Sequence, residues 1–122
     1  MLKRAVLSVL VCLFSGGIAF ADIDMSNVYA YPVPYNPKKS SMKAIKFDKG
    51  VWPSVSSIKM EVFDINGDSV TERTFTTAGD VQWNARNSSG KMVAPGMYII
   101  KLSVEDSNGD FGKKIIRVLI AY

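Results

Sequence analysis

The stretch that decides the fold runs from Ile58 to Ile65, IKMEVFDI, and Asn66-Gly67 follows it directly. Apolar and charged residues alternate along it, which is typical of a strand with one buried face, here Ile58, Met60 and Val62. Asn-Gly is the strongest short hairpin signal, because both central residues of a type I′ turn need positive φ. The stretch therefore predicts a central strand that turns back into the polar segment Asp68 to Phe75.

Two further segments repeat this alternation near the C-terminus. Met97 to Glu105 (MYIIKLSVE) and Phe111 to Ala121 flank a second Asn-Gly turn. Shorter segments of the same kind are Val28 to Val33, Met42 to Asp48, Val81 to Trp83 and a short bridge at Lys91 to Ala94. No segment has the 3.6-residue period of a helix of normal length. The chain is therefore predicted to be all-β, with seven or eight antiparallel strands in a two-sheet sandwich.

This arrangement places a defined set of residues in the core and another in the turns. The predicted core consists of Ile45, Phe47, Ile58, Met60, Val62, Val81, Trp83, Tyr98, Ile100, Leu102, Val104, Ile116, Val118 and Ile120. The predicted turns contain Asn66, Gly67, Gly90, Pro95, Gly96, Asn108 and Gly109. Three prolines between Val28 and Pro37 lack the amide donor of a central strand, so we place that segment at a sheet edge or in a loop.

Upstream of these strands, residues 1–21 form a predicted signal peptide. Lys3 and Arg4 precede an apolar run from Ala5 to Phe14, and Ala19-Phe20-Ala21 supplies the small residues of a cleavage site. A membrane anchor is the alternative, but the apolar stretch is shorter than a spanning helix requires and contains two glycines. A lipoprotein signal at Cys12 is a third reading, which Val11 before it disfavours. We expect a polar leader at residues 22–27 and one domain at residues 28–122, secreted or periplasmic, without an integral membrane segment after cleavage.

Composition excludes several classes of chemistry. The chain has no histidine, and its one cysteine lies in the predicted signal peptide. A Ser-His-Asp or Cys-His site and the usual zinc sites are therefore ruled out, and no cofactor is expected. Removal of Lys3 and Arg4 lowers the formal charge from +4 to +2, too little to indicate binding to nucleic acid. Asp64 to Asp68 and Asp106 to Asp110 resemble calcium loops only superficially and are interpreted as hairpin turns.

Four blocks, in order, resemble one known family. Tyr31 to Pro37 (YPVPYNP) is similar to the YPNPFNP opening of the FlgD-type immunoglobulin-like domain, and Val62 to Gly67 to its V-Y-D hairpin. Gln82 to Lys91 resembles its W-x-G loop, and Val93 to Tyr98 its V-A-P-G-x-Y block. The family comprises flagellar hook-capping proteins and the C-terminal sorting domains of type IX (Por) secretion. The resemblance implies an immunoglobulin- or fibronectin-like sandwich with an attachment or sorting role and no enzymatic activity.

Two departures and the context qualify this resemblance. Val33 replaces the usual Asn of the opening motif, and Ala85 replaces the usual Gly after the Trp, which limits positive φ there. A sorting domain normally follows a large cargo, whereas here the predicted domain follows the predicted signal almost directly.

Several side chains are candidates for contact with a partner. They are Tyr29, Tyr31, Tyr35, Trp52, Asn84, Arg86 and Asn87. The tyrosines alternate with prolines and either dock a partner or close the sandwich edge. Trp52 stands beside Pro53 in a predicted loop, where an exposed aromatic ring suits binding. The lysines between residues 38 and 49 either contact an acidic polymer or form a solvated face.

Two functions remain open from the residues. The first is a non-enzymatic interaction module that joins a surface or secretion assembly through a protein partner, by surface complementarity or by strand addition at Val28 to Val33 or Asp68 to Phe75. The second is a carbohydrate- or wall-binding module in which Trp52 and the nearby tyrosines stack on sugar rings. Binding to a glycan array that Trp52→Ala abolishes would distinguish the second from the first.

Overall fold

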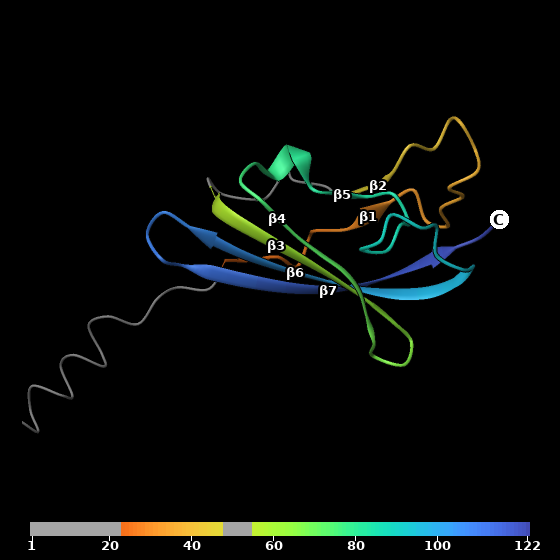
Figure 1. Cartoon of the computed structure of the whole chain (residues 1–122). Helices are drawn as coiled ribbons and strands as arrows, with labels where there is room; N and C mark the ends of the chain where they lie inside the picture. Colours follow the sequence, from red (N-terminus) through yellow and green to blue (C-terminus); the bar gives the residue numbers. More distant parts are fainter. Residues whose placement is uncertain (1–22, 48–54) are drawn as a thin grey trace, which may run out of the picture.

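The computed structural model describes residues 23–47 and 55–122. Within these residues the chain forms two antiparallel sheets that face each other (Figure 1). One sheet has the strand order β4-β3-β6-β7 and the other β1-β2-β5. The seven strands confirm the predicted all-β sandwich. Their bounds are β1 Ala30–Tyr31, β2 Ile45–Phe47, β3 Val55–Asp64, β4 Ser69–Phe75, β5 Gln82–Trp83, β6 Gly96–Asp106 and β7 Phe111–Ile120, with a short 3₁₀ helix η1 at Ala78–Asp80.

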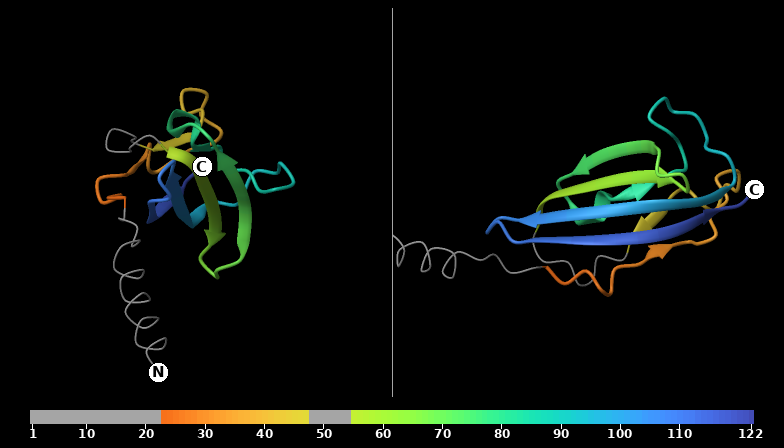
Figure 2. Two further views of the ribbon diagram at one scale, coloured as in Figure 1. Left: turned by 90° about the vertical axis from the view of Figure 1, so that its left-hand side faces the viewer. Right: turned by 90° about the horizontal axis from the view of Figure 1, so that it is seen from below.

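The long sheet is built around β3 and β6. Met60 pairs with Leu102 and Val62 with Ile100, so the alternating apolar residues of both strands share one face. Strand β7 continues this register on the other side of β6. The long strands run together along the sandwich, and the shorter β1, β2 and β5 lie across one face of them (Figure 2). The period-2 pattern of the sequence therefore becomes one apolar surface.

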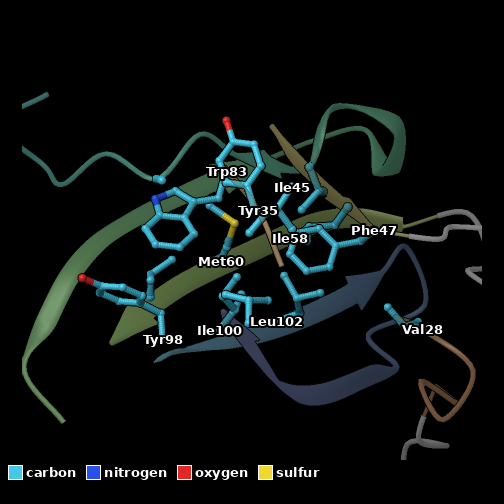
Figure 3. Packing of buried hydrophobic residues seen from close by; sticks show 14 of the residues in the cluster. Val28, Tyr35, Ile45, Phe47, Ile58, Met60, Trp83, Tyr98, Ile100 and Leu102 are labelled. Carbon is cyan, nitrogen blue, oxygen red and sulfur yellow. The ribbon is translucent and has the colours of Figure 1, made fainter. Parts of the chain in front are cut away.

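The core lies between the two sheets, where side chains from both point toward one another (Figure 3). Thirteen of the predicted core residues are buried, and Ile116 is partly buried and packs against them. The indole of Trp83 meets the ring of Tyr98 edge to face, with ring centroids 5.4 Å apart. Buried apolar residues that the sequence analysis did not place in the core are Met25, Val28, Tyr35, Ala44, Phe75, Ala85 and Val93.

Several strand bounds differ from those predicted. Only Ala30–Tyr31 forms a strand in the Val28 to Val33 segment, because Pro32 and Pro34 cannot donate hydrogen bonds to a ladder. Strand β2 covers three residues, whereas seven were predicted from Met42 to Asp48. Strand β3 begins earlier than predicted, at Val55.

The hairpin between β3 and β4 is not the predicted type I′ turn. The Asp64 N–H donates to Asp68 O at 3.0 Å and the Gly67 N–H to Asp64 O at 3.0 Å, which leaves three residues in the loop. Gly67 has φ 85°, while Asn66 is not among the residues with positive φ. Both features define a type I turn followed by a glycine bulge. Asparagine-glycine thus predicted the hairpin but not its type.

The aspartate that opens this turn holds it together. Asp64 Oδ1 accepts hydrogen bonds from the N–H groups of Asn66 and Asp68, at 2.9 and 3.0 Å. Asp106 makes the same two contacts in the β6–β7 turn. These carboxylates therefore act as turn acceptors. In the described part of the chain, no three acidic, histidine or cysteine side chains are grouped so as to hold a metal ion.

Residues 23–27 were predicted to be a polar leader, but they pack against the sandwich. The Ile23 N–H donates to Phe111 O at 2.8 Å, and Met25 is only 3% exposed. Gly112 in β7 lies directly under this segment. The apolar side chains of Ile23 and Met25, isolated among polar neighbours in the sequence, explain the difference. Among the described residues, no helix has the length and apolar character to cross a membrane.

Candidate functional site

The predicted contact residues fall into separate regions of the structure. Tyr35 is 1% exposed, and its hydroxyl donates to Lys43 O at 3.0 Å. Its N–H also donates to Leu119 O at 2.8 Å, so Tyr35 joins β7 to the segment before β2. Tyr35 is therefore part of the core, and its prediction as a partner-binding residue is wrong. Trp52 lies outside the described residues.

Tyr29 and Tyr31 remain on the surface. They are 55% and 44% exposed, and their ring centroids lie 5.9 Å apart. Tyr31 pairs with Lys46 of β2, which is also exposed, so both side chains belong to the outward face of the short sheet. This face combines aromatic rings with a cationic group.

Asn84, Arg86 and Asn87 belong to a loop that its own hydrogen bonds hold in shape. The Trp83 Nε1–H donates to Arg86 O at 2.9 Å, and the Val93 N–H donates to Ala85 O at 2.8 Å. Arg86 Nη1 donates to Gly90 O at 2.9 Å. The buried Trp83 thus fixes the start of the loop to the core, and the Arg86 side chain joins the start of the loop to its end at Gly90.

Within this loop, Asn87 acts as Asp64 and Asp106 do in their turns. Its Oδ1 accepts from the N–H groups of Ser89 and Lys91, both at 3.0 Å. Ala85 has φ 60°, so it adopts the conformation for which the family that it resembles usually has glycine. The predicted limit on positive φ at this position does not prevent the turn, because the surrounding hydrogen bonds hold Ala85 there.

A cleft of about 560 Å³ opens between this loop, β4 and the outward side of β2 and β5. Its cationic groups are Lys43, Lys46, Arg73 and Arg86. Gln82 and Asn84 also line it, and the buried Trp83 lies at its base. We call these residues the basic cleft. It brings together Asn84, Arg86 and Asn87, which the sequence singled out as contact residues, with Lys43 and Lys46 of the predicted lysine-rich segment and with Arg73, which no sequence motif marked.

One acidic residue, Glu72, lines the basic cleft, and its carboxylate already has a partner. Its Oε1 lies 3.3 Å from Lys59 Nζ on the outer face of the long sheet. Arg73 lies with its guanidinium carbon 5.2 Å from the centre of the Phe75 ring. Burial raises the pKa of the Tyr35 phenol, and the positive charge of Arg86 partly opposes that rise. Because four cationic residues line the basic cleft and its one acidic residue is paired with Lys59, the basic cleft is suited to an anionic group.

Strand β4 borders the cleft with an open edge. The Asp64 N–H donates to Asp68 O. The backbone N–H and C=O groups of the even-numbered residues of β3 therefore point toward β4. Thr71 and Arg73 pair with Val62 and Met60, so their backbone N–H and C=O groups point toward β3. It follows that the backbone N–H and C=O groups of Glu72 and Thr74 point away from the sheet. Just before them, Val70 O accepts the Ser88 N–H at 3.1 Å, so the loop covers only the start of this edge.

Comparison with known proteins agrees with this architecture. The chain matches the family described as the secretion system C-terminal sorting domain over residues 29–118. No enzyme family is found, and a search of curated protein sequences gives no significant match. The family is a non-catalytic sorting module of exported proteins.

Two solved structures of Porphyromonas gingivalis are similar to this chain. PorZ, described as an essential bacterial surface component of the type-IX secretion system, matches with a TM-score of 0.55 and 25% identity. The match covers 80% of this chain and 12% of the PorZ chain. Dimeric latent PorU gives a TM-score of 0.48 at 18% identity, over 77% of this chain and 9% of the PorU chain. The chain thus corresponds to a small part of each of these proteins.

The family match covers both sheets, from Tyr29 beside β1 to Val118 in β7. It confirms the resemblance carried by the four sequence blocks, and it implies export to the cell surface or beyond. The chain belongs to the secretion system C-terminal sorting domain family, whose members target exported proteins to the type IX secretion system.

Proposed function

We propose that this domain is a non-enzymatic attachment module that docks onto a protein of the type IX secretion assembly at the cell surface. The observation that carries the proposal is the family match over residues 29–118, which includes both sheets of the sandwich. The basic cleft supports it, because the cleft presents four cations and an open strand edge on one side of the domain. Such a surface can dock a partner without any catalytic group.

A delivery experiment tests this function. A small reporter is placed between the signal peptide and residues 22–122 and is produced in a bacterium with a type IX system and in a strain in which that system is disabled. We expect the reporter at the surface or in the medium of the first strain and in the periplasm of the second.

The matched control is the same fusion carrying Met60→Asp. Met60 is 0% exposed, so a charge there destroys the sandwich while the rest of the fusion is unchanged. Delivery that depends on a folded domain is lost in this control. Retention of the intact fusion in the periplasm of the first strain would refute the proposed function.

A carbohydrate- or wall-binding module is the second candidate, and the exposed tyrosine pair is the observation in its favour. Tyr29 and Tyr31 are both exposed and their rings are inclined at 50° to each other, which offers an aromatic surface to a sugar. Glycan-array binding that disappears in Tyr29→Ala/Tyr31→Ala supports this function. The contribution of Trp52 stays a prediction, tested by Trp52→Ala on the same array, and an array without any bound glycan removes the candidate.

A further inference from the structure

We propose that the basic cleft receives an extended acidic peptide segment of the partner protein, which adds as a strand to the open edge of β4. The identity of the partner rests on the proposed function. The chemistry of the segment rests on the cleft alone, and it follows from the charges, from the backbone edge and from the alternation of side chains along a strand.

The positive charges of the cleft favour an anionic partner. Lys43, Lys46, Arg73 and Arg86 all line it and are all exposed. Arg86 uses Nη1 to bond Gly90 O, and a guanidinium has further N–H donors available for a carboxylate. The one acidic lining residue, Glu72, directs its carboxylate to Lys59 on the outer face of the long sheet, away from the cleft. Carboxylates entering the cleft therefore meet an excess of positive charge.

The backbone edge favours a peptide over another anion. Glu72 and Thr74 direct their N–H and C=O groups outward, and no hydrogen bond joins these groups to the rest of the described chain. An extended peptide satisfies such groups by forming one more ladder, whereas a polysaccharide or inorganic anion cannot pair with them in register. The chain already makes one contact of this type, from Ser88 to Val70.

Side-chain alternation defines the sequence of the segment. Arg73 pairs with the core residue Met60, so its side chain leaves β4 on the side of the short sheet, toward the cleft. Glu72 and Thr74 leave on the opposite side. Every second side chain of an added strand lies on the same side as Arg73. The acidic residues of the segment therefore occupy alternate positions, with neutral residues between them.

Binding of a short synthetic peptide of alternating glutamate and threonine to purified residues 22–122 tests this inference. Fluorescence polarisation measures the affinity, and NMR shifts of the backbone amides locate the site. We expect saturable binding with shifts at Glu72, Thr74 and the loop after Trp83. A lysine–threonine peptide should not bind. The same acidic peptide N-methylated at alternate backbone nitrogens should bind far more weakly, because it keeps its charges but cannot form the ladder.

Two pairs of variants separate charge from backbone. Lys43→Gln/Lys46→Gln should weaken binding about tenfold, as expected for two partly screened ion pairs. Lys113→Gln/Arg117→Gln is the matched control, since it removes the same charge from exposed positions of β7 and should leave binding unchanged. Thr74→Pro removes an outward N–H and should abolish peptide binding with an unchanged circular dichroism spectrum.

The outcomes are decisive in each direction. Equal binding of the methylated and unmethylated peptides overturns strand addition. Stronger binding of heparin than of the peptide, unaffected by Thr74→Pro, assigns the cleft to an anionic polysaccharide instead. Absence of any binding to the acidic peptide also overturns the inference. If reporter delivery succeeds in that case, the proposed function stands and only the acidic-peptide site falls.

Discussion

Replacing Gly112 by alanine tests whether residues 23–25 are an integral part of the sandwich. A Cβ at this position would lie 2.6 Å from the carbonyl oxygen of Ile23 and 3.0 Å from Ile23 Cβ and Met25 Cγ. A backbone oxygen cannot rotate out of the way as a flexible side chain can. The N-terminal segment must therefore move away from β7 or detach from it.

The magnitude follows from what this segment contributes. Detachment breaks the 2.8 Å hydrogen bond from Ile23 N–H to Phe111 O, which stabilises the fold by about 1 kcal/mol. It also exposes Met25, now 3% exposed, at a cost of about 2 kcal/mol. Full detachment therefore lowers the free energy of unfolding by about 3 kcal/mol, a large share of the roughly 5–15 kcal/mol typical of a domain. A small displacement without detachment costs about 1 kcal/mol.

Urea unfolding of purified residues 22–122, followed by tryptophan fluorescence, measures this loss. The decisive measurement is a double-mutant cycle with Met25→Ala, which removes most of the same apolar contact without crowding β7. We expect the double variant to lose clearly less stability than the sum of the two single losses, because both act on one segment. Strict additivity, or no measurable effect of Gly112→Ala, would refute the role assigned to this contact.

Four further predictions address the turns and the ionisable groups. Gly67→Ala should cost about 1 kcal/mol in urea unfolding, because Gly67 has φ 85°; an unchanged midpoint contradicts the turn assignment. Tyr35→Phe should cost about 1 kcal/mol because it removes the part-buried hydrogen bond from the Tyr35 hydroxyl to Lys43 O, and equal stability of the two proteins would show that the hydroxyl contributes nothing. Burial raises the pKa of Tyr35 and Tyr98 above the ordinary value of 10.0. The two phenols therefore ionise at a lower pH in the unfolded chain than in the folded one. Their contribution to the free energy of unfolding is fully present below pH 10.0 and is lost as the pH rises from there through the folded-state pKa values; a Tyr35→Phe/Tyr98→Phe variant that loses the same stability in alkali argues against this origin. Hydrogen bonds from Ser26 lower the pKa of Asp24 below its ordinary value of 3.8. Its small contribution to the free energy of unfolding is therefore present above pH 3.8 and is lost as the pH falls through the folded-state pKa; an NMR titration that gives an ordinary pKa in the folded state contradicts this.

The local pattern was sufficient to predict the long sheet. Residues 58–62 and 98–104 alternate so regularly that only an extended chain gathers their apolar side chains on one face. The structure pairs these two segments directly, Met60 with Leu102 and Val62 with Ile100. Alternation along a strand needs no information from the rest of the chain, which is why these core residues could be read from the sequence.

The candidate site was only partly accessible in this way. Asn84 and Arg86 stand out because they follow the Trp83 motif, and they do line the basic cleft. Lys46 was marked only as one of the lysines between residues 38 and 49, and Arg73 carries no local signal, since it is an exposed charge on its own strand. They meet only because the packing of the two sheets brings β4, an edge strand of the long sheet, and β2, the central strand of the short sheet, to the same cleft. Tyr35 shows the opposite error, because its polar, proline-rich surroundings in the sequence conceal a buried side chain.

By itself, the sequence determined the strand pattern, the hairpin positions and the sorting-domain family, because each of these depends on residues close together in the chain. Tertiary structure alone decided that Met25 and Tyr35 are buried, that the turn at Gly67 is a bulged type I turn, and that four cations surround an open strand edge. The physical reason is that burial, and the proximity of like charges from separate strands, depend on how the two sheets pack. No local period in the sequence encodes that packing.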